Sequence, residues 1–333
     1  MNVGYGITKM EMKHFSEHLC KGLINNGNTC YLNSSLTCLA HCSTFTYPVI
    51  AYSYNTCRVY TTLHDLFKTI WVSDQVGDTC DLIAALQPQF KDIMNLRQQN
   101  DAMEFIMVFL DILNTELGTT ERKAIHNKRL RGANRLVDFM KCSWTNSHAL
   151  NFSFIVDTCY GQNVLQLKCK SCGGMEHKSE IFLNMAVPLD NSSNGGLLEK
   201  IIKTFVHENV QRECDFCKAK CEGSCSQKIW KLPKLLIIHL KRFDSSNIKV
   251  HTPVDVPETI DFNDFVLYDT DTKFQLKAIS CHSGSTNYGH YFSLCKNARG
   301  AWYLYDDESE PKQLNSYKDV NSVAYYILFY EML

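Results

Sequence analysis

The amino-acid sequence predicts an α+β protein, because helical and strand-like patterns occupy separate blocks of the chain. Residues 30–118 carry apolar side chains at the spacing of helix faces. Residues 152–189 alternate apolar and polar side chains in the manner of strands, and residues 273–330 supply several more strands. Residues 235–240 are continuously apolar, which is typical of a central strand buried on both faces of its sheet.

The first predicted helix begins near Cys30, after the turn-forming residues 25–28. Three leucines follow at the spacing of one helix face: Leu32, Leu36 and Leu39. Asn28 or Thr29 can cap this helix, which places Cys30 in its first turn. The free N–H groups and the positive dipole end there favour a thiolate. Cys30 is therefore a candidate nucleophile, and the alternative is an ordinary buried cysteine.

Another helix is predicted after Asn100, a residue that can cap it. Its apolar face has helical spacing: Ala102, Phe105, Ile106, Phe109, Leu110 and Leu113. Strand patterns follow at residues 164–168 and 181–189. A loop rich in Asn, Ser and Gly at residues 191–196 then precedes a further helical stretch at 197–205.

A candidate base lies far along the chain, at His290. This residue follows Gly289 and opens a predicted strand after a flexible loop. A second strand, at residues 302–305, ends in Asp306 and Asp307. If the two strands are neighbours, one carboxylate lies beside His290 and orients it, as in a nucleophile–base–orienter triad. A structural histidine and an acidic turn are the ordinary alternatives.

Two Cys-x-x-Cys pairs suggest a metal site: Cys169 with Cys172, and Cys214 with Cys217. Two such pairs complete a tetrahedral Zn²⁺ site, and four thiolates leave no position for water, so the zinc would be structural. A local site of Cys214, Cys217, Cys221 and Cys225 is the alternative, and so are disulfides or free thiols. We favour the two pairs because they would join two strands instead of closing one loop.

Composition indicates an intracellular globular protein, located in the cytoplasm, the nucleus or both. The formal net charge of −1 argues against general binding to nucleic acid or anionic membranes. The sequence has no apolar run of about 18 residues that could span a membrane, and its N-terminus lacks a secretory signal pattern. Without such a signal, the 16 cysteines are better explained by reduced thiols and metal ligation than by disulfides.

A basic segment at residues 121–135 contains six Lys and Arg residues. We interpret it as a solvated insertion, and contact with an acidic partner or nucleic acid is the alternative.

Together these motifs resemble those of the ubiquitin-specific proteases, the papain-like cysteine deubiquitinases. The cysteine motif at residues 22–36 and the histidine motif at 289–291 with 302–307 carry the resemblance. Residues 99–105 and the closing strand 324–331 resemble two further family elements, so the similarity runs from Gly22 to Glu331.

The resemblance implies a papain-like cysteine protease fold with three parts after an N-terminal extension at residues 1–21. These are a helical thumb at residues 22–150, β fingers stapled by zinc at 151–231, and a β-sheet palm at 232–331.

The resemblance also implies roles for the site residues. Cys30 would be the nucleophile, His290 the general base and then acid, and Asp306 the orienting residue, with Asp307 as the alternative. Asn25, five positions before Cys30, would donate a hydrogen bond to the oxyanion.

Asp101 and Glu104 lie one helical turn apart. On physical grounds alone they would compensate the dipole of the helix that they begin. The resemblance instead implies that they line a channel for the ubiquitin tail, which ends in Leu-Arg-Gly-Gly. Gly289 would leave this channel narrow enough for glycines only, and Tyr291 would pack on the tail.

The implied activity is that of a cysteine-type ubiquitinyl hydrolase, which forms an acyl-enzyme on Cys30. Its partners would be ubiquitin and ubiquitinated proteins. Two alternatives stay open: a latent ubiquitin-binding protein that needs an activating partner, and a protease for another ubiquitin-like modifier. Asn100 and Thr37 stand where many family members have Gln, which removes no catalytic group.

Overall fold

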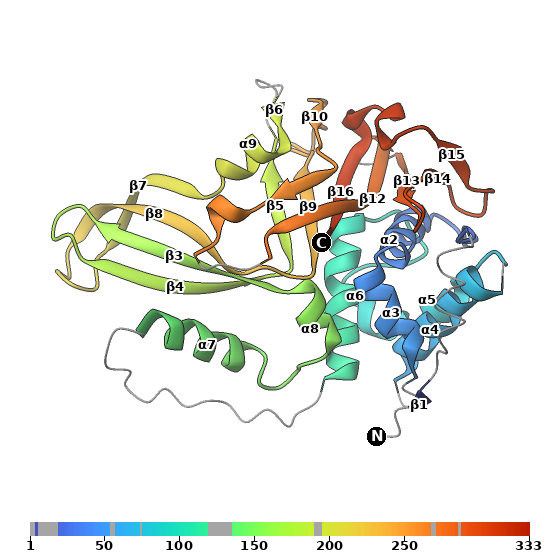
Figure 1. Ribbon diagram of the computed structural model, residues 1–333, viewed down its shortest axis with the longest axis horizontal. Helices are drawn as coiled ribbons and strands as arrows, with labels where there is room; N and C mark the ends of the chain where they lie inside the picture. The colour runs from blue at the N-terminus through green and yellow to red at the C-terminus, as the bar shows by residue number, and fades with distance from the viewer. Residues whose placement is uncertain are drawn as a thin grey trace.

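The computed structural model describes residues 4–5, 19–53, 57–73, 75–118, 135–189, 195–267, 271–285 and 288–333. Most of the N-terminal extension, the basic segment up to residue 134 and part of the loop 191–196 lie outside these residues. Figure 1 shows helices at one end of the molecule, a large sheet in the middle and a second, long sheet that projects to the other end. The α+β prediction is confirmed.

The helical part is built around α2 (Cys30–Ala40), every residue of which is buried. The helices that surround it are α3 (Ser43–Ala51), α4 (Arg58–Val72), α5 (Cys80–Phe90) and α6 (Ala102–Leu117). Because α2 packs on α3 and α6 on one side and on the large sheet on the other, its position is fixed by both parts of the molecule.

The N-cap of α6 is Asp101, and not Asn100 as predicted. The Asp101 Oδ1 atom accepts hydrogen bonds from the backbone N–H groups of Met103 and Glu104, at 2.8 and 3.0 Å. The Asn100 side chain instead donates to the Tyr31 hydroxyl at 3.0 Å and to carbonyls of its own loop. The prediction was wrong because that loop uses the Asn100 amide before the helix begins.

The large sheet has eight strands, with the order β15-β14-β13-β12-β16-β9-β5 and β11 paired to β12. Its strands are β5 (Asn184–Pro188), β9 (Leu235–Lys241), β11 (Thr259–Asp261), β12 (Lys273–Gly284), β13 (Gly289–Lys296), β14 (Trp302–Tyr305), β15 (Lys312–Leu314) and β16 (Tyr325–Met332). The predicted central strand is β9, which lies between β16 and β5. Leu235 and Ile237 join the core beneath the helices, whereas Leu236 and Ile238 join the core of the opposite face. Burial on both faces is therefore confirmed for this strand.

The projecting sheet has four antiparallel strands, in the order β4-β3-β8-β7. Their bounds are β3 (Gly161–Cys169), β4 (Met175–Phe182), β7 (Val206–Glu213) and β8 (Lys220–Lys231). Two turns, β3 to β4 and β7 to β8, lie at its far end (Figure 1) and carry the two Cys-x-x-Cys pairs. The predicted strand at 181–189 is two strands, because the chain leaves this sheet after Phe182 and β5 pairs in parallel with β9.

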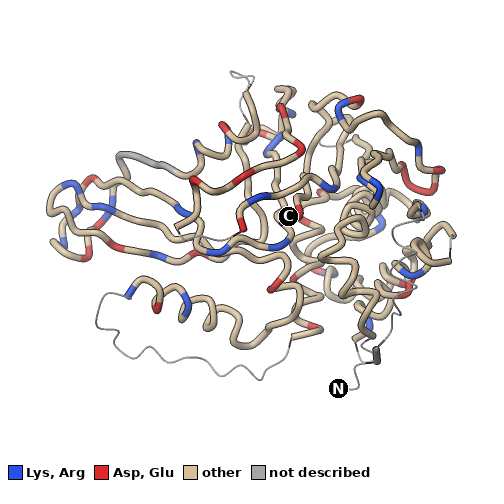
Figure 2. The backbone as a smooth tube through the Cα atoms, viewed as in Figure 1, with Lys and Arg blue, Asp and Glu red and all other residues tan. Residues whose placement is uncertain are grey.

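The shorter elements connect these layers. They are β1 (Gly4–Tyr5), β2 (Tyr52–Ser53), α7 (Arg135–Ser147), α8 (Phe154–Cys159), β6 (Gly195–Gly196), α9 (Leu197–Ile202), β10 (Val254–Asp255), η1 (Asn263–Phe265), η2 (Tyr317–Asp319) and η3 (Ser322–Ala324). Acidic and basic residues are interspersed along the described backbone (Figure 2). None of the helices in the described part of the chain has the length and hydropathy of a membrane span.

Candidate active site and metal centre

Cys30 is the first residue of α2, as predicted, and directly follows the N-cap residue Thr29, whose side chain makes no capping hydrogen bond to the helix. The chain turns into the helix through Gly27 and Asn28, which have φ angles of 93° and 50°. Such left-handed conformations favour Gly and Asn, which explains their place in this turn. Cys30 is only 5% exposed, so the candidate nucleophile is largely shielded from solvent.

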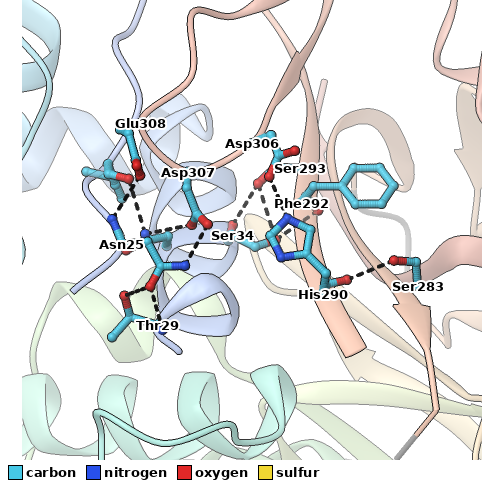
Figure 3. A network of polar contacts seen from close by, with 12 residues as sticks. Asn25, Thr29, Ser34, Ser283, His290, Phe292, Ser293, Asp306, Asp307 and Glu308 are labelled. Atoms are coloured by element: carbon cyan, nitrogen blue, oxygen red, sulfur yellow. Dashed lines mark hydrogen bonds and ion pairs between the residues drawn. The ribbon is translucent and has the colours of Figure 1, made fainter. Parts of the chain in front are cut away.

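His290 lies beside Cys30 and Asp306. It is the second residue of β13, and Asp306 follows the paired strand β14, so the predicted neighbouring strands are confirmed. The His290 Nε2 atom is 2.5 Å from Asp306 Oδ1 (Figure 3). Hydrogen bonds with Cys30 and then with Asp306 raise the pKa of His290 to about 9, against the effect of burial. Because Asp306 occupies Nε2, Nδ1 is the nitrogen left for Cys30.

Asp307 bonds the turn before α2, although its carboxylate stays within 4.8 Å of a His290 ring nitrogen. Its φ angle of 47° is left-handed, which sends two consecutive carboxylates in different directions (Figure 3). Its oxygens accept from the Asn25 and Asn33 side-chain amides, each at 2.8 Å. Burial raises the pKa of Asp307 although both amides favour the carboxylate. The structure therefore places Asp306, and not Asp307, against the histidine.

Asn25 is held on both ends of its amide. Its carbonyl oxygen accepts from the backbone N–H and the hydroxyl of Thr29, each at 3.1 Å, and its NH₂ group donates to Asp307. The neighbouring Asn26 instead donates to Asp78 and Thr79 in another loop. Of these two asparagines, only Asn25 is therefore oriented by a residue next to the candidate base. Its NH₂ group has two hydrogens, and Asp307 accepts one of them.

Asp101 and Glu104, the two acidic residues expected to line the channel, have different surroundings. Asp101 caps α6 with one oxygen and accepts from the Tyr326 hydroxyl with the other, whereas Glu104 is exposed. The two carboxylates therefore do not form one free acidic wall. Asp101, Tyr291 and Tyr326 line a cavity of about 320 Å³ that reaches His282.

His282 is a residue whose importance the sequence analysis missed. A Cβ atom on Gly289 would lie 2.0 Å from His282 Nε2, so this ring fills the space that a side chain at 289 would need. The Lys249 Nζ atom lies 3.2 Å from Nδ1 on the other side of the ring. Burial, followed by Lys249, lowers the pKa of His282 to about 4 and keeps the ring neutral. No sequence pattern marks His282, because it meets Gly289 only through the pairing of β12 with β13.

A buried group of serines joins the nucleophile helix to the base strand. Ser34 lies one turn after Cys30, and its Oγ atom is 2.8 Å from Ser280 Oγ and 3.2 Å from Ser293 Oγ. Ser34 also donates to the Phe292 carbonyl at 3.0 Å (Figure 3). All three serines are at most 3% exposed. The one available sequence signal was a polar residue on the buried face of an apolar helix.

The far tip of the projecting sheet gathers cysteine thiols. The Sγ atoms of Cys169, Cys214, Cys217 and Cys221 all lie within 4.8 Å of one another. Four sulfurs at this separation suit a tetrahedral metal with Zn–S bonds of about 2.3 Å. The two predicted pairs therefore meet, but Cys221 joins them, and Cys172 lies beside the group with its Sγ 3.6 Å from Cys214 Sγ. Cys225, the last member of the alternative local set, is outside the group of four in the described structure.

The chain is similar to known proteins over most of its length. The sequence profile of the family described as "Ubiquitin carboxyl-terminal hydrolase" matches residues 21–330. "Ubiquitin carboxyl-terminal hydrolase Usp2" of Drosophila melanogaster is 32% identical over 98% of this chain and 36% of its own length. "Ubiquitin carboxyl-terminal hydrolase 21" of Bos taurus is 27% identical over 94% of this chain and 61% of its own length. The chain thus spans less than two thirds of the length of these curated relatives.

Solved structures share the fold. The SAGA Ubp8/Sgf11/Sus1/Sgf73 DUB module, solved with monoubiquitin and with ubiquitin aldehyde, matches with a TM-score of 0.74 at 18% identity. The match to the ubiquitin aldehyde complex covers 100% of this chain and 72% of the matched one. A profile match over residues 21–330 on a chain that brings Cys30, His290 and Asp306 together shows that this protein belongs to the ubiquitin carboxyl-terminal hydrolase family.

Proposed function

We propose that this chain is a thiol-dependent deubiquitinase that cleaves the isopeptide or peptide bond after the C-terminal Gly-Gly of ubiquitin. The observation that carries the proposal is the meeting of Cys30, at a helix N-terminus, with a histidine whose pKa is raised to about 9 by Cys30 and Asp306. A histidine that holds its proton in this way stabilises a thiolate beside it. Membership of the family supports the same reaction.

The proposed reaction has two steps. The Cys30 sulfur attacks the carbonyl carbon of the last glycine of ubiquitin, and the C–N bond breaks as His290 gives its proton to the leaving amine. The product of this step is a thioester between Cys30 and ubiquitin. His290 then takes a proton from water, which attacks the thioester and releases ubiquitin and the thiolate with the protonated histidine.

Asn25 is our proposed oxyanion donor. One of its amide hydrogens is held by Asp307, and the other is available to the developing oxyanion at the N-terminus of α2. A donor of this kind lowers the barrier by about 3 kcal/mol. Asp307 is then a positioning residue for Asn25, and Asp306 is the corresponding residue for His290.

We propose that the tail of ubiquitin passes Gly289 and enters the cavity bounded by Tyr291 and Asp101. Exposed Glu104 is suited to pair with the arginine of the tail, since its carboxylate is not used by the helix cap. Asp101 contributes indirectly, because it fixes both the start of α6 and the Tyr326 hydroxyl.

A structural Zn²⁺ ion at the tip of the projecting sheet is part of the proposal. Cys169, Cys214 and Cys217 would hold it together with one further thiol, either Cys172 or Cys221. The ion would staple the two turns of the sheet that we equate with the fingers of the family. We further propose that the protein acts in the cytoplasm or nucleus on ubiquitinated proteins.

A second candidate is a latent enzyme that needs an activating protein partner. It is favoured by the nature of the structural matches, which are modules of Ubp8 with three other subunits. Both candidates use the same residues and differ only in turnover by the isolated chain.

The experiment is labelling by ubiquitin that carries a C-terminal electrophile, together with hydrolysis of a fluorogenic ubiquitin amide. We expect labelling and turnover by the wild type and neither by Cys30→Ser. Cys80→Ser is a matched control, because Cys80 also begins a helix after a threonine N-cap but serves no proposed role. Labelling without turnover would favour the latent enzyme. Labelling only by a different ubiquitin-like probe would change the modifier, and no labelling of folded protein would overturn the proposal.

A further inference from the structure

The tip of the projecting sheet holds five cysteines where a tetrahedral metal ion takes four. We name them the fingertip cluster: Cys169, Cys172, Cys214, Cys217 and Cys221. We propose that Cys172 and Cys221 are alternative fourth ligands, each able to complete the site formed with the other three. This inference rests on the proposed zinc site and adds to it a ligand that no Cys-x-x-Cys pair contains.

Cys221 has the geometry of a ligand. Its Sγ atom is 3.2 Å from that of Cys169 and lies within 4.8 Å of those of Cys214 and Cys217. Cys221 is the second residue of β8, the strand that pairs with both β3 and β7. Cys169 also lies on a strand, as the last residue of β3, whereas Cys172, Cys214 and Cys217 come from the two turns.

Cys172 approaches the same centre from the opposite turn. Its Sγ atom is 3.6 Å from Cys214 Sγ, and its backbone N–H points at Cys169 Sγ over 3.4 Å. The turn that carries it closes through Gly173, whose φ angle is 71°. Unlike Cys221, which is 7% exposed, Cys172 is an exposed residue. One candidate is therefore buried on a strand and the other lies on a solvent-facing turn.

The positive charge of Arg212 would balance part of the negative charge of several thiolates at the tip. Arg212 stands directly opposite Cys221 in the ladder between β7 and β8. One side of its guanidinium pairs with Glu176, but the buried Nη1 atom has no hydrogen-bond partner among the described residues. This guanidinium places a positive charge opposite Cys221, and a positive charge nearby favours the thiolate form of cysteine.

The test compares Cys172→Ser, Cys221→Ser and the double variant in the full chain. Zinc content is measured by mass spectrometry, zinc affinity by competition with a chromophoric chelator, and the ligand set by the sulfur-to-metal charge-transfer spectrum after Co²⁺ substitution. Cys225→Ser is the matched control, because Cys225 lies on the same strand as Cys221 but outside the group of four. None of these readouts depends on hydrolysis of ubiquitin.

We expect each single variant to keep one zinc and a four-thiolate cobalt spectrum, with affinity weakened by less than about tenfold. The double variant should lose that spectrum and bind zinc at least about 100-fold more weakly. If Cys172→Ser alone weakens binding as much as the double variant, Cys221 is not a ligand and the inference fails. If Cys221→Ser alone weakens zinc binding as much as the double variant, Cys172 is not a ligand and the inference also fails. A wild type without zinc but with full ubiquitin hydrolysis would reject this site and the proposed zinc ion while leaving the proposed hydrolytic activity intact.

Discussion

At the scale of single residues, the site depends on two adjacent carboxylates, Asp306 and Asp307, which bond different partners. Asp306 continues the direction of β14 and meets His290, while the left-handed backbone of Asp307 turns its side chain to Asn25. One acidic pair at a strand end thus supports both the proposed base and the proposed oxyanion donor.

The raised pKa of His290 predicts a pH dependence of stability. The pKa is about 9 in the folded protein and 6.5 for an ordinary histidine. The stabilisation is therefore fully present below pH 6.5 and is lost as the pH rises through 9. We expect the free energy of unfolding of the wild type to fall between these values more than that of His290→Gln, as measured by urea unfolding.

Asp306→Asn provides the control for that experiment. It removes the second cause of the raised pKa and should shift the loss of stability to lower pH. Asp307→Asn should shift this window less than Asp306→Asn does, because Asp307 hydrogen-bonds Asn25 and Asn33 and meets His290 only through its charge. Equal pH slopes in the wild type and His290→Gln would contradict the assigned pKa.

Gly289 is predicted to tolerate no side chain. A Cβ atom would lie 2.0 Å from His282 Nε2, and that ring is packed against the rings of Phe243 and Tyr291. We expect Gly289→Ala to displace the start of β13 and to lower kcat/KM by about 100-fold. Steady-state hydrolysis of the fluorogenic ubiquitin amide measures the effect.

The second change His282→Ala should restore part of this loss by opening space for the new methyl group. Gly196→Ala serves as the control, because no atom lies within 4 Å of a Cβ atom at that glycine. Activity unchanged in Gly289→Ala would show that the ring moves freely and does not restrict this position.

At the scale of elements, α2 connects all the parts of the site. Cys30 begins the helix, and Ser34 bonds the serines of β12 and β13 in its middle. His41, its C-cap residue, bonds the Tyr305 hydroxyl at 3.0 Å, and Tyr305 directly precedes Asp306. Movement of this one helix would therefore displace the nucleophile relative to both the base and its orienting carboxylate.

The serine group should show strong non-additivity. Ser34→Ala leaves the buried Ser280 hydroxyl without the Ser34 hydroxyl, which costs about 1–3 kcal/mol of stability, whereas Ser293 keeps the backbone carbonyl of residue 34 as an acceptor. Replacing all three serines by Ala removes the stranded Ser280 hydroxyl, so the triple variant should lose less than the sum of the single variants. Urea unfolding measures the stability, and kcat measured separately from KM reports the position of Cys30.

Ser35→Ala is the matched control, because among the described residues the Ser35 hydroxyl bonds only the Tyr31 carbonyl of its own helix. It should affect kcat less than Ser34→Ala does. Purely additive losses among the three serines would show that their hydroxyls act independently.

At the scale of the whole molecule, the fold has separate apolar cores. One lies between the helices and the large sheet, and another lies on the opposite face of that sheet. The buried thiols of Cys169, Cys214 and Cys221 form a third, small cluster that is not continuous with either. The far tip of the projecting sheet therefore has little apolar support of its own.

Metal removal should therefore unfold the tip locally. We expect a chelator to abolish hydrogen-exchange protection at the ends of β3 and β8 while α2 and α6 keep theirs. Alkylation of Cys30 by a small reagent should continue at the same rate, because the site lies in another core. Loss of protection throughout the chain would show instead that the metal supports the entire fold.

Features that depend on neighbouring residues could be predicted from the sequence, and features that depend on distant residues could not. Apolar periodicity, turn residues and Cys-x-x-Cys spacing act over a few residues, and they were enough to predict the helix at Cys30, the strands at His290 and Asp306, and the meeting of the two cysteine pairs. Tertiary structure decided between Asp306 and Asp307, which the residue pattern alone left open, and it decided that β5 joins the large sheet and that Cys221 reaches the thiol cluster. Each of these depends on strand register or on contacts between residues far apart in the chain, which no local pattern encodes.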